Sequence, residues 1–162
     1  MKPLDLIKHA VKAQGNSESK YSNYPVGCAL LSDDDKIIYG CNIESAVYPS
    51  TLCAERIAIY SALSQGIKKF KAIAIVSNTG ARPCGACRQI MYEYLGDIPI
   101  FISDSKGKDY LQHSIDELLP YPFDLWNWFI VYIYKSMKKK IIIITLLSLL
   151  SSQDIRYLDE VF

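Results

Sequence analysis

Apolar residues along the first 123 positions recur with spacings that predict alternating helices and strands. Apolar residues that recur three or four positions apart predict a helix over 3–13, and Gly15 marks its end. Short apolar runs typical of strands span 26–31, 36–39, 71–77 and 99–102. Further helices are expected over 53–65 and 84–95. A capping box at Ser114 and Glu117 predicts a short helix that Pro120 ends.

The order of these elements predicts the architecture. Two strands joined by the turn Asp33–Asp35 form a hairpin, and a β-α-β-α-β order follows, which requires crossover connections and a partly parallel sheet. We therefore expect an α/β fold, a three-layer α/β/α sandwich around a mixed sheet. Ala54, Ala58 and Ala62 form a stripe of small residues on the second helix, which suggests contact with another helix or subunit.

Composition narrows the class of protein. The chain has 162 residues, half of them hydrophobic, which is enough for one domain with a core. A net charge of +1 does not indicate binding to nucleic acid. The first residues lack the apolar region of a signal peptide. Five cysteines, an odd number, favour a reducing, cytoplasmic compartment over a disulfide framework.

The candidate chemistry lies in two short segments, Cys53-Ala54-Glu55-Arg56 and Pro83-Cys84-Gly85-Ala86-Cys87. Each segment begins a predicted helix, whose N-terminus stabilises a thiolate. Cys53, Cys84 and Cys87 make three ligands, the number found in catalytic zinc sites that keep one position open. A zinc ligand followed two residues later by Glu, and further on by P-C-x-x-C, is the pattern of zinc-dependent deaminases.

Other residues admit plainer interpretations. A structural zinc module would need a fourth ligand, for which Cys41 is the one plausible donor, and it would leave Glu55 without a purpose. Otherwise Cys28 and Cys41 are expected to be small buried residues. His9 is expected to be a surface or packing residue, and Asp33–Asp35 a solvated turn. By spacing alone, Asn42-Ile43-Glu44 is a polar loop end.

Several motifs in register resemble the small homotetrameric zinc-dependent cytidine deaminases. They are the two cysteine segments together with Tyr21-Ser22-Asn23-Tyr24-Pro25-Val26-Gly27, Asn42-Ile43-Glu44 and Glu117-Leu118-Leu119-Pro120. The resemblance spans about residues 4 to 123 and implies a catalytic domain over 1–123 with the cytidine deaminase-like fold, including a five-stranded sheet. It implies hydrolytic deamination of cytidine and 2′-deoxycytidine to uridine and deoxyuridine in pyrimidine salvage.

The resemblance also implies a role for each matching residue. Cys53, Cys84 and Cys87 would bind one zinc ion per subunit, and Glu55 would shuttle protons while hydroxide generated at the zinc attacks C4. The substrate-binding residues would be Asn42 and Glu44 at the ribose, Tyr24 in place of an aromatic residue that lies against the base, Ala54 through its backbone, and Phe123 in a neighbouring subunit's pocket. The expected partners are a nucleoside and further copies of the chain, without nucleic acid.

The charge of the metal site assigns a role to Arg56. Three thiolates outweigh the charge of Zn²⁺, so the site needs a cation to withdraw charge from the sulfurs. Arg56 follows Glu55 directly and could donate a hydrogen bond to a thiolate, whereas the alternative is a surface salt bridge. Blasticidin-type deaminases are an enzymatic rival with a similar zinc site. Cytosine and deoxycytidylate deaminases usually have His as their first zinc ligand, whereas this chain has Cys53 at that position.

The extension over 124–162 departs from the family, whose members usually end soon after the position of Phe123. Apolar runs at 126–134 and 141–150 flank a basic segment, Lys135 to Lys140, and neither run reaches the length of about 18 residues needed for a membrane span. Three interpretations remain: a tail that is poorly packed or is a non-native product of read-through or frameshift, an added packing element, or a membrane-surface contact. We expect the membrane contact least.

Overall fold

The computed structural model describes residues 1–137, and the second predicted apolar run of the extension lies outside this range. Its elements are α1 (Pro3–Gln14), β1 (Val26–Ser32), β2 (Ile37–Cys41), the 3-10 helix η1 (Tyr48–Ser50), α2 (Ala54–Ser64), β3 (Phe70–Ser77), α3 (Gly85–Leu95), β4 (Ile100–Asp104), β5 (Leu111–His113), α4 (Ile115–Leu118) and α5 (Leu125–Met137). The chain divides into two compact units, Met1–Pro122 and Phe123–Phe162.

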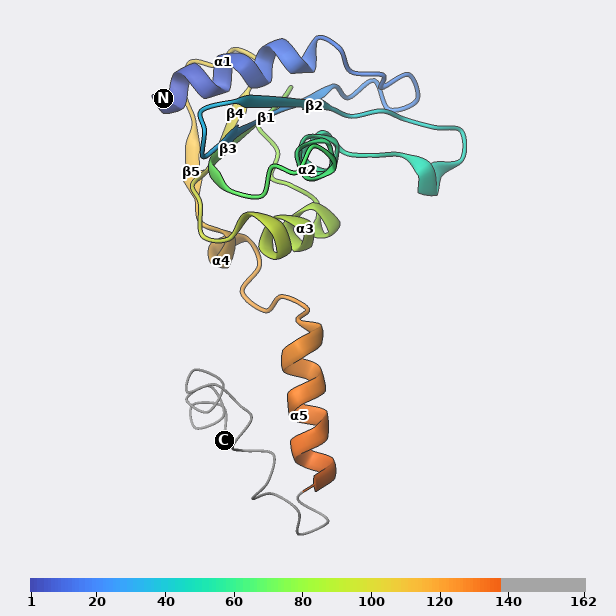
Figure 1. The fold of residues 1–162 in the computed structure, drawn as a ribbon. Helices are drawn as coiled ribbons and strands as arrows, with labels where there is room; N and C mark the ends of the chain where they lie inside the picture. Colours follow the sequence, from blue (N-terminus) through green and yellow to red (C-terminus); the bar gives the residue numbers. More distant parts are fainter. Residues whose placement is uncertain (138–162) are drawn as a thin grey trace. The chain divides into compact units, whose positions relative to one another are not determined.

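The first unit is the predicted three-layer sandwich (Figure 1). Its five strands lie in the order β2-β1-β3-β4-β5. The β1 strand runs antiparallel to β2 and β3, β3 and β4 are parallel, and β5 is antiparallel to β4. The β3–α3–β4 crossover therefore brings the carboxyl ends of two parallel strands to one edge. The mixed, partly parallel five-stranded sheet is confirmed.

Alternation along the strands sends side chains to two cores. On one face, Ala29 and Leu31 of β1 and Phe101 of β4 pack against Leu6 and Ile7 of α1. On the other face, the core joins the sheet to α2, α3 and α4, and its strand residues are Cys28, Leu30, Ile73, Ile75, Ile100 and Ile102. Figure 1 shows α1 on one side of the sheet and α2 with α3 on the other. Cys28 is fully buried, as predicted.

The alanine stripe of α2 packs inside the chain rather than against another subunit. Ala54, Ala58 and Ala62 are fully buried within this chain. They face strand β2, where a Cβ built on Gly40 would lie 2.1 Å from the Ala54 carbonyl oxygen. The stripe therefore lets the helix backbone approach a strand, and the expectation of a contact with another subunit is wrong.

Other local predictions shift by a residue or two. The helices predicted to begin at Cys53 and Cys84 begin at Ala54 and Gly85, because both cysteines are N-cap residues with extended backbone. The capping box is confirmed, since Ser114 Oγ accepts from the Glu117 N–H and the Glu117 carboxylate accepts from the Ser114 N–H. Strand β5 was not apparent from the residue pattern, because its three residues form an edge with little buried apolar surface.

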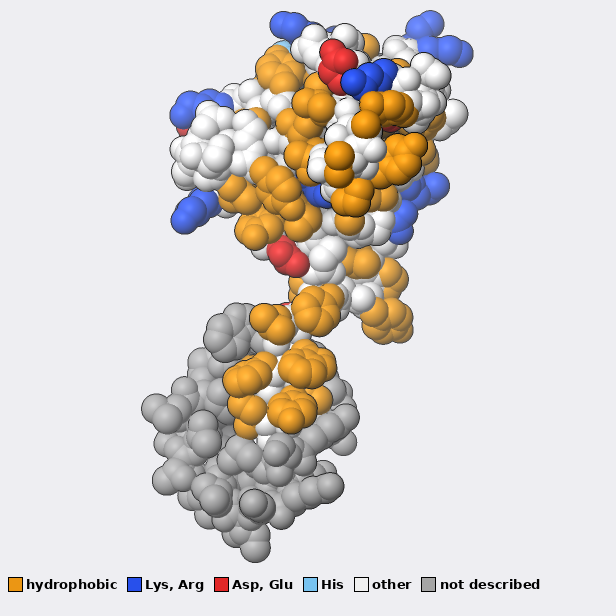
Figure 2. Space-filling view, turned by 90° about the vertical axis from the view of Figure 1, so that its right-hand side faces the viewer, with side chains coloured by type: hydrophobic (Ala, Val, Ile, Leu, Met, Phe, Trp, Pro, Cys, Tyr) orange, Lys and Arg blue, Asp and Glu red, His pale blue; other side chains and the backbone are white. Residues whose placement is uncertain are grey.

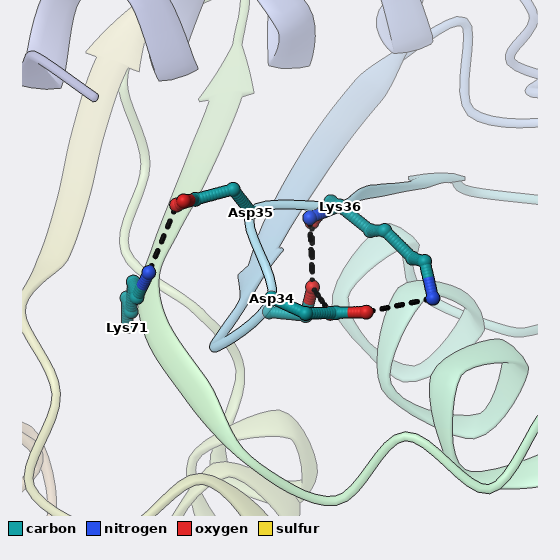
Figure 3. A network of polar contacts seen from close by, with 5 residues as sticks. Asp34, Asp35, Lys36 and Lys71 are labelled. Carbon is teal, nitrogen blue, oxygen red and sulfur yellow. Dashed lines mark hydrogen bonds and ion pairs between the residues drawn. The ribbon is translucent and has the colours of Figure 1, made fainter.

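The acidic triplet forms the predicted turn. Figure 3 shows Asp34 paired with Lys36, at 2.6 Å, and Asp35 paired with Lys71 of β3, at 2.9 Å. Asp33, Asp34 and Asp35 are all exposed. Because two of the three carboxylates already have lysine partners, the interpretation as a solvated turn is supported over that of a metal site. His9 lies on α1, where its Nδ1 is 2.7 Å from the Tyr39 hydroxyl, in agreement with a surface role.

The second unit contains helix α5. The exposed side chains Leu125, Trp128, Phe129 and Tyr132 recur at helical spacing, and the Trp128 and Tyr132 rings stack with centroids 5.4 Å apart. Figure 2 shows apolar side chains along the described part of this helix. Over residues 1–137, none of the helices combines the length and hydropathy required to cross a bilayer.

Candidate functional site

Three sulfur atoms gather at the N-termini of two neighbouring helices. Cys53 and Cys84 are the N-cap residues of α2 and α3, and Cys87 lies in the first turn of α3. The three sulfurs lie within 4.8 Å of one another, and those of Cys53 and Cys84 are 3.9 Å apart. Tetrahedral zinc–thiolate bonds place sulfurs about 3.8 Å apart, so this cluster fits zinc with little movement.

The cluster offers three ligands and no fourth cysteine. Among the residues that the structure describes, the group able to hold a metal consists of Cys53, Cys84 and Cys87. Cys41 lies outside it, and its thiol donates to the carbonyl of Asn16 instead. The structural zinc module, which needs a fourth protein ligand, is therefore not supported, and one coordination position is left for water or substrate.

Positive charge reaches the cluster from Arg56. Its Nη2 donates to the Cys53 sulfur, at 3.7 Å, and to the carbonyl oxygen of Thr51, at 3.1 Å. The hydrogen bond from Cys87 and, next, the guanidinium of Arg56 lower the pKa of Cys53 to about 5. The hydrogen bond to Cys53 and burial raise the pKa of Cys87. Arg56 thus makes the predicted contact with a ligand sulfur, whereas the alternative of a surface salt bridge has no counterpart among its described contacts.

Glu55 lies in the first turn of α2, beside the sulfurs but outside the ligand group. Its side chain is 4 % exposed. Burial raises the pKa of its carboxyl to about 7. A carboxyl group that both gains and loses a proton near neutral pH is suited to serve as a general base and then as a general acid.

A cavity of about 440 Å³ opens onto this cluster. Cys53, Cys84 and Glu55 line it together with three of the predicted substrate residues, Tyr24, Asn42 and Glu44. The remaining lining residues are Ser22, Val26, Thr51, Leu52, Ile75, Ser77, Ala81, Arg82 and Pro83. The structure thus brings five segments of the chain to one cavity of nucleoside size.

The predicted ribose residues are themselves held by hydrogen bonds. The Glu44 carboxylate accepts from the N–H groups of Tyr21, at 2.7 Å, and Ser22, at 3.0 Å, and from the Ser22 hydroxyl. The amide oxygen of Asn42 accepts from the Val26 N–H and the Ser17 hydroxyl, and its amide nitrogen donates to the Tyr24 carbonyl. These bonds orient both side chains, and Asn42 keeps one N–H for a ligand.

Two predicted contacts fall outside the cavity lining. Ala54 is fully buried, yet it begins α2, and the first N–H groups of a helix have no partner within the helix. Its backbone is therefore available beside the cluster. Phe123 belongs to the second unit and is 62 % exposed, and its predicted role in a neighbouring subunit stays a prediction. Ser77 lines the cavity but was not predicted, because an isolated hydroxyl residue at the end of a buried strand carries no spacing signal.

Comparison with known proteins places this site in a family. Residues 2–100 match the family model described as "Cytidine and deoxycytidylate deaminase zinc-binding region". The chain belongs to this family. Its zinc-dependent deaminase fold, the enzyme class and the zinc cofactor agree with the sequence prediction and with the cluster of three sulfurs.

Individual relatives agree with the family match. The chain is 43 % identical over 121 residues to a cytidine deaminase of Sporosarcina psychrophila, covering 73 % of this chain and 88 % of the relative. It is 42 % identical over 121 residues to a cytidine deaminase of Halalkalibacterium halodurans, covering 73 % and 91 %. The crystal structure of cytidine deaminase from Burkholderia pseudomallei is similar with a TM-score of 0.72 and 40 % identity, covering 76 % of this chain and all of that one.

Proposed function

We propose that this protein deaminates cytidine and 2′-deoxycytidine hydrolytically, forming uridine or deoxyuridine and ammonia, as part of cytoplasmic pyrimidine salvage. The observation that carries the proposal is the buried Glu55 beside an open three-sulfur cluster, at the wall of a cavity that also contains Asn42 and Glu44. Zinc held by Cys53, Cys84 and Cys87 would lower the pKa of a bound water toward neutrality.

The residues of the chain supply the proton transfers. Glu55 takes a proton from the attacking water and delivers it to N3 of the pyrimidine. It then takes the second proton, from the hydroxyl now on C4, and passes it to the amine, which leaves as ammonia while the C4 carbonyl forms. Its burial supports this role, because a carboxyl with a pKa of about 7 can serve both as acceptor and as donor at neutral pH. No separate acid is needed, since one carboxyl changes state twice in each turnover.

Charge and orientation come from residues around Glu55. Arg56 and the N-termini of α2 and α3 withdraw charge from the thiolates, which keeps the metal electrophilic. Asn42 and Glu44 bind the ribose hydroxyls, and the ring of Tyr24 lies against the base. We further propose that residues 1–123 form the catalytic unit, that Ala54 contributes its backbone N–H, and that Phe123 completes the pocket of a neighbour in a homotetramer.

A deamination assay on purified protein tests the proposal, with zinc content measured in the same sample. We expect conversion of cytidine and 2′-deoxycytidine, which is measured as the loss of absorbance on deamination. The rate of conversion should be proportional to the bound zinc. Cytosine, deoxycytidylate and blasticidin S serve as comparison substrates. Zinc-replete protein that turns over blasticidin S but neither nucleoside would overturn the proposal in favour of its rival.

The ribose assignment is tested by Glu44→Ala. We expect cytidine turnover, as kcat/KM, to fall about 10- to 100-fold, because hydrogen bonds to a charged group contribute about 1.5–3 kcal/mol. Zinc content should not change, since Glu44 is not a ligand. Glu93→Ala, which removes an exposed carboxylate of α3 outside the cavity lining, is the matched control. Unchanged cytidine kinetics in Glu44→Ala would show that the ribose assignment is wrong.

The role of Arg56 is tested by Arg56→Ala and Arg56→Lys. Removing the guanidinium takes away the hydrogen bond to Cys53, and loss of such a contact to a ligand costs about 10- to 100-fold in activity or metal affinity. Lysine keeps the charge without the planar fork, so Arg56→Lys should retain more turnover than Arg56→Ala. If Arg56→Ala is as fast as the wild type, the two helix N-termini suffice to balance the thiolates.

A further inference from the structure

The segment that carries the ligand Cys84 is mostly exposed. It joins β3 to the start of α3, and over residues 78–86 Pro83 is the one buried residue. Cys84 itself is exposed, and its side chain makes no capping hydrogen bond to α3. Exposed segments with few buried contacts open at low free-energy cost, so a metal ligand within one needs a separate support to stay in place.

Arg88 contacts the one buried residue of this segment. Its Nε donates to the Pro83 carbonyl oxygen, at 2.8 Å, and its Nη1 donates to the carbonyl oxygen of Leu118, also at 2.8 Å. Proline has no N–H, so its carbonyl is the backbone group through which a hydrogen bond can hold it. This carbonyl belongs to the peptide group between Pro83 and Cys84. The guanidinium of Arg88 therefore holds the backbone that leads directly into the ligand.

The second carbonyl belongs to a firmly packed helical turn. Leu118 is the last residue of α4, and the last carbonyl groups of a helix have no partner within the helix. Ile115 and Leu118 are buried in the same core as Cys87 of α3, and the capping box at Ser114 closes the start of α4. Arg88 thus ties the exposed metal-binding segment to an element whose position is set by core packing.

The contacts of Arg88 differ from those of Arg56. Arg56 donates to a ligand sulfur, whereas Arg88 donates to two uncharged carbonyl groups. A planar guanidinium keeps its N–H donors at fixed positions and so sets the separation of its two acceptors, which a single ammonium group cannot do. We propose that Arg88 is a positioning residue for the metal site, which holds Cys84 in place by tying Pro83 to the end of α4. This role rests on the zinc site of the proposed function.

Zinc affinity tests this role in the absence of substrate. Wild-type protein and Arg88→Ala are titrated against a chromogenic zinc chelator. We expect Arg88→Ala to bind zinc about 10-fold more weakly, at the lower end of the losses that follow removal of a group supporting a metal ligand.

Ile7→Val is the matched control for a loss of stability alone. Ile7 is fully buried in the core on the opposite face of the sheet from the metal site. Its replacement should lower the melting temperature by about 3 °C and leave zinc affinity unchanged. If Arg88→Ala also melts at a lower temperature but binds zinc as tightly as the wild type, its contacts support only the fold, and the positioning role is overturned.

Arg88→Lys separates the effect of position from that of charge. Lysine keeps the positive charge but cannot span both carbonyl groups, so its zinc affinity should stay close to that of Arg88→Ala. Full recovery of the wild-type affinity in Arg88→Lys would show that a nearby positive charge is sufficient. That result would overturn the positioning role.

A double-mutant cycle tests α4 as the anchor. Ser114→Ala removes the side-chain cap of this short helix. A loosened α4 affects Pro83 only while Arg88 connects the two. Ser114→Ala should therefore weaken zinc binding about 3-fold in the wild type and have no further effect in the Arg88→Ala background. Equal losses in both backgrounds would overturn the connection through Arg88.

Zinc binding and deamination are measured separately, so the two proposals can fail independently. Weaker zinc binding by Arg88→Ala would support the positioning role even if the wild-type protein did not deaminate cytidine. Wild-type protein that binds zinc but converts neither cytidine nor 2′-deoxycytidine would refute the proposed function alone. Wild-type protein that binds no zinc would overturn both proposals.

Discussion

Replacing Glu55 by glutamine is expected to lower kcat for cytidine by at least about 100-fold while zinc content stays the same. Glutamine keeps the size and polarity of the side chain but cannot carry the proton, and general acid–base groups contribute about 10²- to 10⁴-fold. Zinc should remain, since the three cysteine sulfurs form the metal-binding group without Glu55. The measurement is a steady-state assay of zinc-replete protein, with metal content determined on the same preparation.

The matched control for this variant is Glu93→Gln, which makes the same chemical change on the exposed side of α3. It should retain both turnover and zinc. A Glu55→Gln protein with normal zinc and near-normal kcat would refute the proton-transfer role. Loss of zinc in that variant would instead show that Glu55 supports the metal site, contrary to its place outside the sulfur cluster.

A second large effect is expected from Gly40→Ala. An added Cβ would lie 2.1 Å from the Ala54 carbonyl oxygen and 2.7 Å from the Ala58 nitrogen. Both are backbone atoms, so helix α2 would have to move, and overpacking of this kind costs about 3 kcal/mol. The melting temperature should fall by about 10 °C. Because α2 carries Cys53 and Glu55, zinc content and turnover should fall with it.

Gly15→Ala provides the control for the backbone change. Gly15 has a right-handed helical backbone, and its added Cβ would meet its nearest neighbour, the Lys12 carbonyl oxygen, at 3.4 Å. We expect stability within about 0.5 kcal/mol of the wild type. The melting temperatures of the two variants, measured by calorimetry or spectroscopy, are compared with that of the wild type. A Gly40→Ala protein that melts within about 2 °C of the wild type would show that α2 does not pack closely on β2.

The sequence by itself predicted the three-sulfur cluster and the class of fold. The two cysteine segments place their ligands and Glu55 within one helical turn of each helix start, so local spacing was sufficient to predict them. The α/β class was also predictable from the sequence, because the apolar runs alternate between helical and strand lengths. Arg56 was predictable because the charge of three thiolates demands a nearby cation.

Tertiary structure decided which distant segments meet. The sulfurs of Cys53 and Cys84 are 3.9 Å apart although 31 residues separate them in the chain, a distance that follows from the β3–α3 crossover. The buried alanine stripe on Gly40 and the contact of Arg88 with Leu118 likewise depend on groups that packing brings together from distant parts of the chain. Spacing reports the face of one helix or strand, whereas the partner of that face is chosen by packing of the whole fold.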